Sequence, residues 1–148
     1  MAQERLLSIE KADPHQYHIL IEIWEASVRG THHFLKEEDI VFFKSMMKEY
    51  LSAVNLFVIK DVTDICGFGG VCDDKLEMLF VHPAYTGRGL GKQLLLYAIT
   101  KMNVTKVDVN EQNENAVGFY LHNGFEVADR SELDSSGKPY PILHLLLK

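Results

Sequence analysis

Three glycines at alternate positions, Gly87, Gly89 and Gly91, form the part of the sequence best suited to chemistry. They follow a stretch typical of a strand and open a stretch typical of a helix, with Arg88 and Lys92 beside them. Such a turn lets successive backbone N–H groups point outward together, and the positive end of the helix dipole adds to their attraction for an anion. The turn therefore predicts either a site for a phosphate-bearing ligand or simply a tight turn that begins a helix.

Two widespread phosphate-binding motifs do not fit this turn. A Walker A loop requires Gly and then Ser or Thr at the positions that Thr86 and Gln93 occupy here. The dinucleotide fingerprint GxGxxG lacks its last glycine, because Lys92 stands there, although Asp108 lies about twenty residues further on as that fingerprint expects. The hypothesis of a nucleotide-dependent oxidoreductase therefore rests on this partial match alone. In addition, a chain of 148 residues is short for a dehydrogenase with a substrate domain.

A second motif, NxxNxxAxxFYxxxGF, follows the next predicted strand at residues 110–125. Together with the loop PxYxGxGxG at residues 83–91, it resembles the GCN5-related N-acetyltransferase family, and the tail at residues 124–141 is similar to a bacterial subgroup of that family. The loop departs from the family pattern at Thr86, where Gln or Arg is usual. Because backbone N–H groups make most of the phosphate contact, we expect cofactor binding to be retained but weaker.

The resemblance implies an enzyme that moves an acetyl group from acetyl-CoA to a primary amine of a small molecule or a peptide by direct attack. It places the backbone of residues 79–81 beside the pantetheine arm, in a slot where the fourth and fifth strands splay apart, and the pyrophosphate on the glycine-rich turn. The implied cofactor-binding residues are Leu79, Phe80, Val81, Gly87, Arg88, Gly89, Leu90, Gly91, Lys92, Asn113, Ala116 and Tyr120. A non-catalytic acyl-CoA sensor with the same slot is the alternative function.

Acetyl transfer needs one group that removes a proton from the amine, whose ordinary pKa is about 10.4, and another that protonates the departing thiolate. The resemblance places Tyr120 near the sulfur, where its phenol can supply a proton; a packing role for the ring is the alternative. Since Tyr120 directly follows Phe119, the two rings cannot share one helix face. Glu77 is the expected base if strand alternation turns it into the acceptor cleft, and otherwise a solvated strand residue.

The acceptor wall is expected just after the first helix, where the resemblance places Trp24, His32, His33 and Phe34. Either histidine can relay a proton, although neighbouring loop histidines are more often simply solvated. Tyr140, between two prolines, either caps the acceptor site from the last loop or stiffens a hairpin. We expect no metal, because no further ligands stand at a suitable spacing for zinc.

Hydrophobic spacing predicts the elements that must position these groups. Helices are expected at residues 14–30, 36–51 and 113–122 and after the glycine-rich turn, and strands at residues 5–10, 54–59, 65–71, 76–81, 104–109, 125–128 and 142–147. The three successive short strands imply an antiparallel meander, and the alternating elements that follow favour parallel pairing. The predicted fold class is α/β (α+β): one domain, residues 1–148, with a mixed, mostly antiparallel sheet flanked by helices.

Composition narrows the class of partner and compartment. Hydrophobic residues make up 47% of the chain and charged residues 24%, which argues against disorder, and a net charge of −6 disfavours nucleic acid as a partner. No apolar run approaches the ~20 residues of a membrane span, and the N-terminus lacks the order of a signal peptide. We therefore expect a cytoplasmic protein with no membrane partner, with Cys66 and Cys72 as thiols, and compatible with a homodimer.

Overall fold

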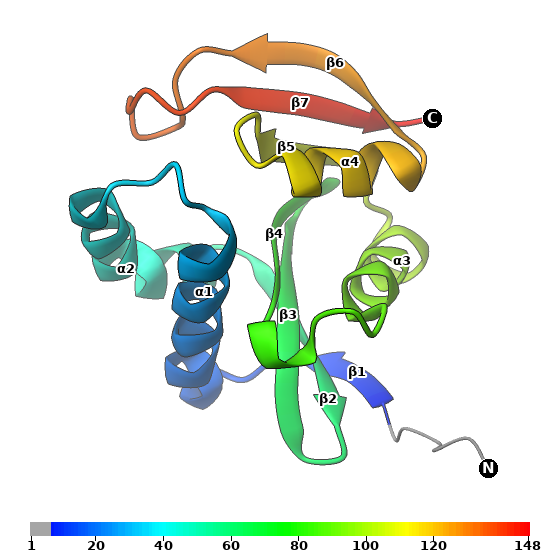
Figure 1. Ribbon diagram of the computed structural model, residues 1–148. Helices are drawn as coiled ribbons and strands as arrows, with labels where there is room; N and C mark the ends of the chain where they lie inside the picture. The colour runs from blue at the N-terminus through cyan, green and yellow to red at the C-terminus, as the bar shows by residue number, and fades with distance from the viewer. Residues whose placement is uncertain (1–6) are drawn as a thin grey trace.

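A single seven-stranded sheet organises the protein in the computed structural model, which describes residues 7–148 (Figure 1). The strands lie in the order β1-β2-β3-β4-β5-β7-β6. Their bounds are Leu7–Lys11 (β1), Asn55–Asp61 (β2), Asp64–Cys72 (β3), Lys75–Val81 (β4), Lys106–Asn110 (β5), Phe125–Ser131 (β6) and Ile142–Leu147 (β7). The helices are Tyr17–Thr31 (α1), Glu37–Ser52 (α2), Leu90–Met102 (α3) and Glu114–His122 (α4), with short 3₁₀ turns at Pro14–Gln16 (η1) and Pro83–Tyr85 (η2).

Most of the predicted elements form close to their predicted ends. The predicted antiparallel meander is confirmed, because β2, β3 and β4 pair in sequence through two short turns. Residues 5 and 6 of the predicted first strand lie outside the described residues, and β1 pairs antiparallel with β2. Within residues 7–148, no helix is long and apolar enough to cross a membrane.

The junction of β4 and β5 is a fork. The two strands run parallel and pair only at Lys75 with Lys106 and at Leu76 with Val107. Beyond these pairs β4 continues to Val81 along β3, while β5 pairs with β7 on its other side. The splay predicted between the fourth and fifth strands is therefore confirmed, and backbone groups facing the fork are left without a strand partner there.

The parallel pairing predicted for the last strands is wrong for β6, because β7 lies between β5 and β6 and runs antiparallel to both. The burial of the two strands explains this order. β7 carries the sequence ILHLLL, with Leu145 fully buried, whereas residues 126–130 of β6 are all exposed. A central strand needs apolar side chains, while a polar strand suits the sheet edge, where it also discourages pairing with another chain.

Helices cover both faces of the sheet, and each face has its own core. In Figure 1, α1 and α2 lie to one side of the strands and α3 and α4 to the other. Leu20 and Leu51 pack with Phe68 on the first side, and Leu94 and Ala98 pack on the second, all fully buried. The apolar stripes predicted from helical spacing therefore face the sheet.

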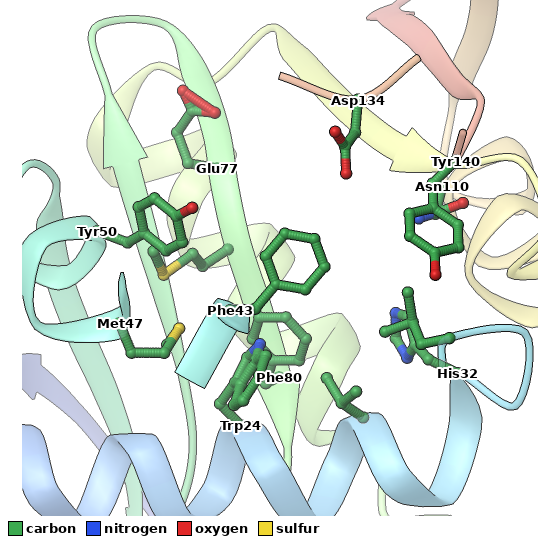
Figure 2. Close-up of a pocket in the computed structure, with 13 residues that line it drawn as sticks. Trp24, His32, Phe43, Met47, Tyr50, Glu77, Phe80, Asn110, Asp134 and Tyr140 are labelled. Carbon is green, nitrogen blue, oxygen red and sulfur yellow. The ribbon is translucent and has the colours of Figure 1, made fainter. Parts of the chain in front are cut away.

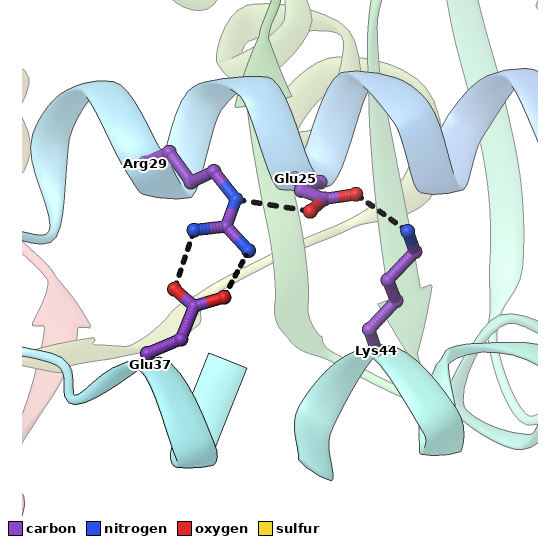
Figure 3. Close-up of polar contacts among 4 residues, drawn as sticks. All are labelled: Glu25, Arg29, Glu37 and Lys44. Atoms are coloured by element: carbon purple, nitrogen blue, oxygen red, sulfur yellow. Dashed lines mark hydrogen bonds and ion pairs between the residues drawn. The ribbon is translucent and has the colours of Figure 1, made fainter. Parts of the chain in front are cut away.

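A network of ion pairs ties α1 to α2 (Figure 3). Arg29 forms a bidentate pair with Glu37, with N–O distances of 2.6 and 2.8 Å, and its Nε lies 2.9 Å from Glu25. Lys44 Nζ lies 2.7 Å from the other oxygen of Glu25. All four side chains reach solvent, so these ion pairs link the two helices but add little to the stability of the fold.

Candidate active site

Glu77 stands on a β-bulge at the fork. Gly70 pairs with Met78 and Val71 pairs with Leu76, so Glu77 is an extra residue that β3 does not match. A bulge reverses which side the flanking residues face: Leu76 packs in the α3–α4 core and Met78 against the α1–α2 core. The bulge, and not a regular pleat, therefore sets the direction of the Glu77 side chain, which lines the cavities beside the fork and is exposed to solvent.

The surroundings of Glu77 favour its protonated form. Partial burial raises the pKa of the Glu77 carboxyl, the charge of Lys75 opposes this, and the nearby carboxylate of Asp108 raises the pKa further. Lys75 Nζ lies 2.9 Å from Asp108 Oδ2, so its charge is shared with that carboxylate. Glu77 consequently holds a proton more strongly than a glutamate with the ordinary pKa does.

A chain of hydrogen bonds holds Asp108 across three strands. His144 Nδ1 lies 2.7 Å from Asp108 Oδ1, and Ser131 Oγ lies 2.7 Å from His144 Nε2. With Lys75 on its other oxygen, Asp108 is held from β4 and β7 together. The charge that acts on Glu77 is thus fixed in position at the base of the fork.

A cavity of about 440 Å³ opens from the fork between β4, β5 and α4. Glu77, Val109 and Asn110 line it near the fork, and Thr86 lines it near the start of α3. The predicted cofactor-binding residues that line it are Leu79, Phe80, Val81, Gly91, Asn113, Ala116 and Tyr120. A long ligand that crosses this cavity would pass from the glycine-rich turn to the fork.

The glycine-rich turn has the backbone that its sequence requires. Gly87 and Gly89 adopt φ values of 79° and 74°, which favour glycine, and an added Cβ at either would meet no described atom within 4 Å. Gly89 caps α3, and no side chain of residues 7–148 caps this helix start. The free N–H groups of the first turn therefore suit a phosphate.

The side chains of the turn lie away from the cavity. Arg88 pairs with Asp61 at 3.4 Å and lies over the ring of Tyr85, Lys92 is exposed, and the Leu90 side chain is buried in the core. Any phosphate contact by Leu90 must accordingly come from its backbone, which is how the sequence motif predicts it.

Tyr120 is the most deeply buried aromatic residue in the wall of this first cavity, with 7% of its surface exposed. Its ring contacts Phe119 and Phe125 edge to face, with centroids 5.2 and 5.8 Å apart. Although Phe119 and Tyr120 cannot share one helix face, both rings line the cavity. Phe119 is half-buried and lies against Gly91. Burial raises the pKa of the Tyr120 phenol, so this hydroxyl keeps its proton through the neutral range.

A second cavity, of about 210 Å³, lies between the fork and helices α1 and α2 (Figure 2). Its lining residues are Trp24, Val28, His32, Leu35, Phe43, Met47, Tyr50, Glu77, Met78, Phe80, Asn110, Asp134 and Tyr140. Five of them, His32, Glu77, Met78, Phe80 and Asn110, also line the first cavity. The two cavities therefore meet at the fork, where groups from both can come together.

His32 is a neutral histidine whose two nitrogens are both engaged. Asn113 Nδ2 lies 3.2 Å from His32 Nε2, and since an amide nitrogen only donates, Nε2 accepts. Nδ1 then carries the hydrogen and donates to Thr31 Oγ1 at 2.7 Å, and Thr31 donates to the carbonyl of Ser27. Burial, helped by the charge of His33, lowers the pKa of His32 to about 4. His32 therefore orients Asn113, and its occupied lone pair makes it a poor proton acceptor.

Of the other residues predicted for the acceptor wall, Trp24 and Tyr140 line the second cavity, whereas His33 and Phe34 do not. His33 is exposed and lines neither cavity, and Phe34 lies behind the wall, with its ring 5.3 Å from that of His32 and 6.1 Å from that of Tyr140. The Tyr140 hydroxyl donates to Asp39, whose other oxygen lies 2.9 Å from Lys138 Nζ. Tyr140 thus lines the cavity and fastens the β6–β7 loop to the start of α2.

Several lining residues were given no role from the sequence. Phe43, Met47 and Tyr50 recur at helical spacing, and this spacing by itself indicates that they share one face of α2. Asn110 opens the second motif; its Oδ1 is buried and has no donor among residues 7–148. Asp134, in the β6–β7 loop, carries no local signal, because only the folded loop brings it to the cavity.

Comparison with known proteins identifies this arrangement. Residues 52–127 match the family described as Acetyltransferase (GNAT) domain. The chain belongs to the GNAT acetyltransferase family. It is 36% identical over 142 residues, or 95% of its length, to the peptidyl-lysine N-acetyltransferase YjaB of Salmonella typhimurium, and covers 98% of that protein. Since its relatives are named as enzymes, the chain is an acetyltransferase and not a non-catalytic sensor.

Solved structures agree with this assignment. The solution structure of apo YjaB from Escherichia coli superposes with a TM-score of 0.88 at 35% identity, covering 96% of this chain and 97% of that one. The PaiA N-acetyltransferase from Thermoplasma acidophilum, solved in complex with coenzyme A, gives a TM-score of 0.72 at 24% identity, covering 93% and 97%. The second comparison shows the shared fold.

Proposed function

We propose that this acetyltransferase moves the acetyl group of acetyl-CoA to a primary amine by direct attack, with Glu77 as proton acceptor and Tyr120 as proton donor. The observation that carries the proposal is the meeting of the two cavities at the fork, with Glu77 lining both. An amine in the second cavity can therefore approach a group held in the first cavity at the residues that the two cavities share. Direct transfer therefore needs no covalent enzyme intermediate.

As a GNAT enzyme, the chain takes acetyl-CoA as its donor, which supplies a thioester when bound. The free N–H groups at the start of α3 suit its pyrophosphate, and the unpaired edge of β4 at residues 79–81 suits the amide groups of its pantetheine arm. Asn113, held by His32 and capping α4, and Ala116 line the same cavity. This arrangement leads the arm toward the fork.

Glu77 accepts a proton from the amine. It lies where the cavities meet. Burial and the charge of Asp108 raise its pKa toward the pH at which the enzyme works, which suits a general base. The carboxylate must be ionised to act, so activity falls when pH falls through its pKa. His32 is excluded from this role by its occupied Nε2 and lowered pKa.

Tyr120 supplies a proton to the departing thiolate. Burial keeps its phenol protonated, and the position of Tyr120 in the wall of the first cavity supports a role beside the pantetheine arm. The half-buried ring of Phe119 and the buried ring of Phe125 hold the Tyr120 ring in place. The tyrosine therefore enters each cycle with the proton that the thiolate takes.

The name of the YjaB relatives supports a lysine side chain of a peptide as one acceptor. The test combines a thiol-release assay on a lysine-containing peptide with intact-mass analysis of peptide and protein. We expect one thiol released per acetyl group found on the peptide, with no stable acetyl-enzyme. Acetyl-CoA consumption without amine acetylation, or an obligatory acetyl-enzyme, would contradict the proposal.

A further inference from the structure

Aromatic rings and the thioethers of Met47 and Met78 form much of the wall of the second cavity. Trp24 is 6% exposed and Met47 is 2% exposed, and the rings of Phe43 and Phe80 complete the wall. Sulfur and aromatic groups both contact aromatic ligands favourably. The wall therefore favours an apolar, and above all a flat aromatic, occupant.

The size of the cavity suits a ring. Its volume is about 210 Å³, whereas an apolar cavity of about 150 Å³ is enough to bind benzene. The four methylenes of a lysine side chain would leave part of this wall uncovered. A six-membered ring on a short linker fills it better and removes more apolar surface from water.

The two acidic side chains of the cavity lie at the end away from Trp24. Figure 2 shows Glu77 and Asp134 at one end and Trp24 at the other, with the Asp134 carboxylate directed toward the cavity. Two carboxylates attract an ammonium group, and the buried Asn110 Oδ1, which lacks a donor within residues 7–148, can accept from it. An occupant would thus place its amine at the fork and its apolar body against Trp24.

We propose that this cavity selects arylalkylamines, primary amines that carry an aromatic ring on a linker of two or three carbons, as small-molecule acceptors. The inference rests on the proposed transfer to a primary amine and specifies the group attached to that amine. The ammonium gives one proton to Glu77, and the neutral nitrogen then attacks the thioester carbonyl. The C–S bond breaks, the thiolate takes the Tyr120 proton, and the second proton that the nitrogen loses restores the Tyr120 phenol. Each group thus does what it does for any other amine.

The first test compares 2-phenylethylamine with n-butylamine, both primary alkylamines, at fixed acetyl-CoA and pH. The phenyl ring buries about four more carbons than the ethyl group that butylamine has in its place, so we expect kcat/KM to be about 5- to 30-fold higher for the aromatic amine. Equal values, or a preference for butylamine, would overturn the inference while leaving the proposed transfer intact.

A pair of variants on α2 tests the wall itself. Phe43→Ala removes a lining ring, and we expect it to lower the ratio of kcat/KM for 2-phenylethylamine to kcat/KM for butylamine at least fivefold, or about 1 kcal/mol. Phe42→Ala is the matched control, because Phe42 is an exposed neighbour on the same helix and lines neither cavity. Thermal unfolding checks that both variants fold. The inference would be contradicted if both variants lost the preference for 2-phenylethylamine equally, or if Phe43→Ala kept it.

Trp24 allows a test that does not depend on transfer. It is the one tryptophan of the sequence and it lines the cavity, so its emission, excited at about 295 nm, reports occupancy directly. With coenzyme A bound, we expect 2-phenylethylamine to change the Trp24 emission in a saturable way and butylamine to change it much less. In Phe43→Ala, the two amines should change the emission to a similar extent. Should no amine be acetylated, the proposed function fails, and this titration still decides whether the cavity binds aromatic amines.

Discussion

Replacing Tyr120 with Phe removes one oxygen from the cofactor cavity and leaves the ring in place. The edge-to-face contacts with Phe119 and Phe125 are retained, so we expect the free energy of unfolding to change by less than about 1 kcal/mol. A placed general acid commonly contributes about 10² to 10⁴ in rate. We therefore expect single-turnover acetyl transfer to slow by a factor in that range, with a much smaller change in acetyl-CoA affinity.

Single-turnover measurement is needed because slow product release can hide a chemical defect in kcat. Quenched-flow sampling of the acetylated amine, with enzyme in excess over acetyl-CoA, follows the chemical step directly. Tyr97→Phe is the matched control: Tyr97 packs against Phe57, with centroids 5.0 Å apart, and lines neither described cavity. If Tyr120→Phe transfers acetyl at the rate of this control, the hydroxyl is not the acid and Tyr120 is a packing residue.

The raised pKa of Tyr120 adds a second expectation to this prediction. Because burial keeps the phenol protonated throughout the neutral range, the ratio of the wild-type to the variant rate should stay constant between about pH 6 and 9. A ratio that falls toward 1 with rising pH in that range would mean that the phenol ionises there, contrary to the reasoning from burial.

Three further predictions concern other parts of the site. Gly89→Asp should weaken coenzyme A binding at least tenfold by calorimetry on the folded variant, because it puts a negative charge and a side chain at a φ of 74° where phosphate is expected; unchanged affinity would refute the phosphate role. Glu77→Gln should lower kcat/KM near neutral pH about 10²-fold or more, with the loss shrinking at high pH where free amine is abundant; wild-type rates at every pH would exclude Glu77 as the base. Tyr140 and Lys138 hold the pKa of Asp39 below its usual 3.8, so the stabilisation is present above that pH and is lost as pH falls through the lower, folded-state pKa. Asp39→Asn should therefore unfold at a lower temperature than the wild type at neutral pH, and the difference should shrink in acid; a difference independent of pH would contradict the ion pair.

The sequence by itself determined the order of the elements and the glycine-rich turn. Both are local: Gly87 and Gly89 sit at positive φ because the turn demands it, and the apolar stripes of α1 and α3 follow helical spacing. The second motif likewise carried the resemblance to the GNAT family, which the matches to residues 52–127 and to YjaB confirm.

Only the tertiary structure decided how these elements meet. The bulge at Glu77 depends on the register between β3 and β4, and the position of β7 depends on which late strand is apolar enough to be central. His32 is held by Asn113, 81 residues away, and Tyr140 by Asp39, 101 residues away. Periodicity reports the faces of an element but not its partners. The fork, the neutral histidine and the aromatic cavity are products of long-range pairing, which local patterns do not encode.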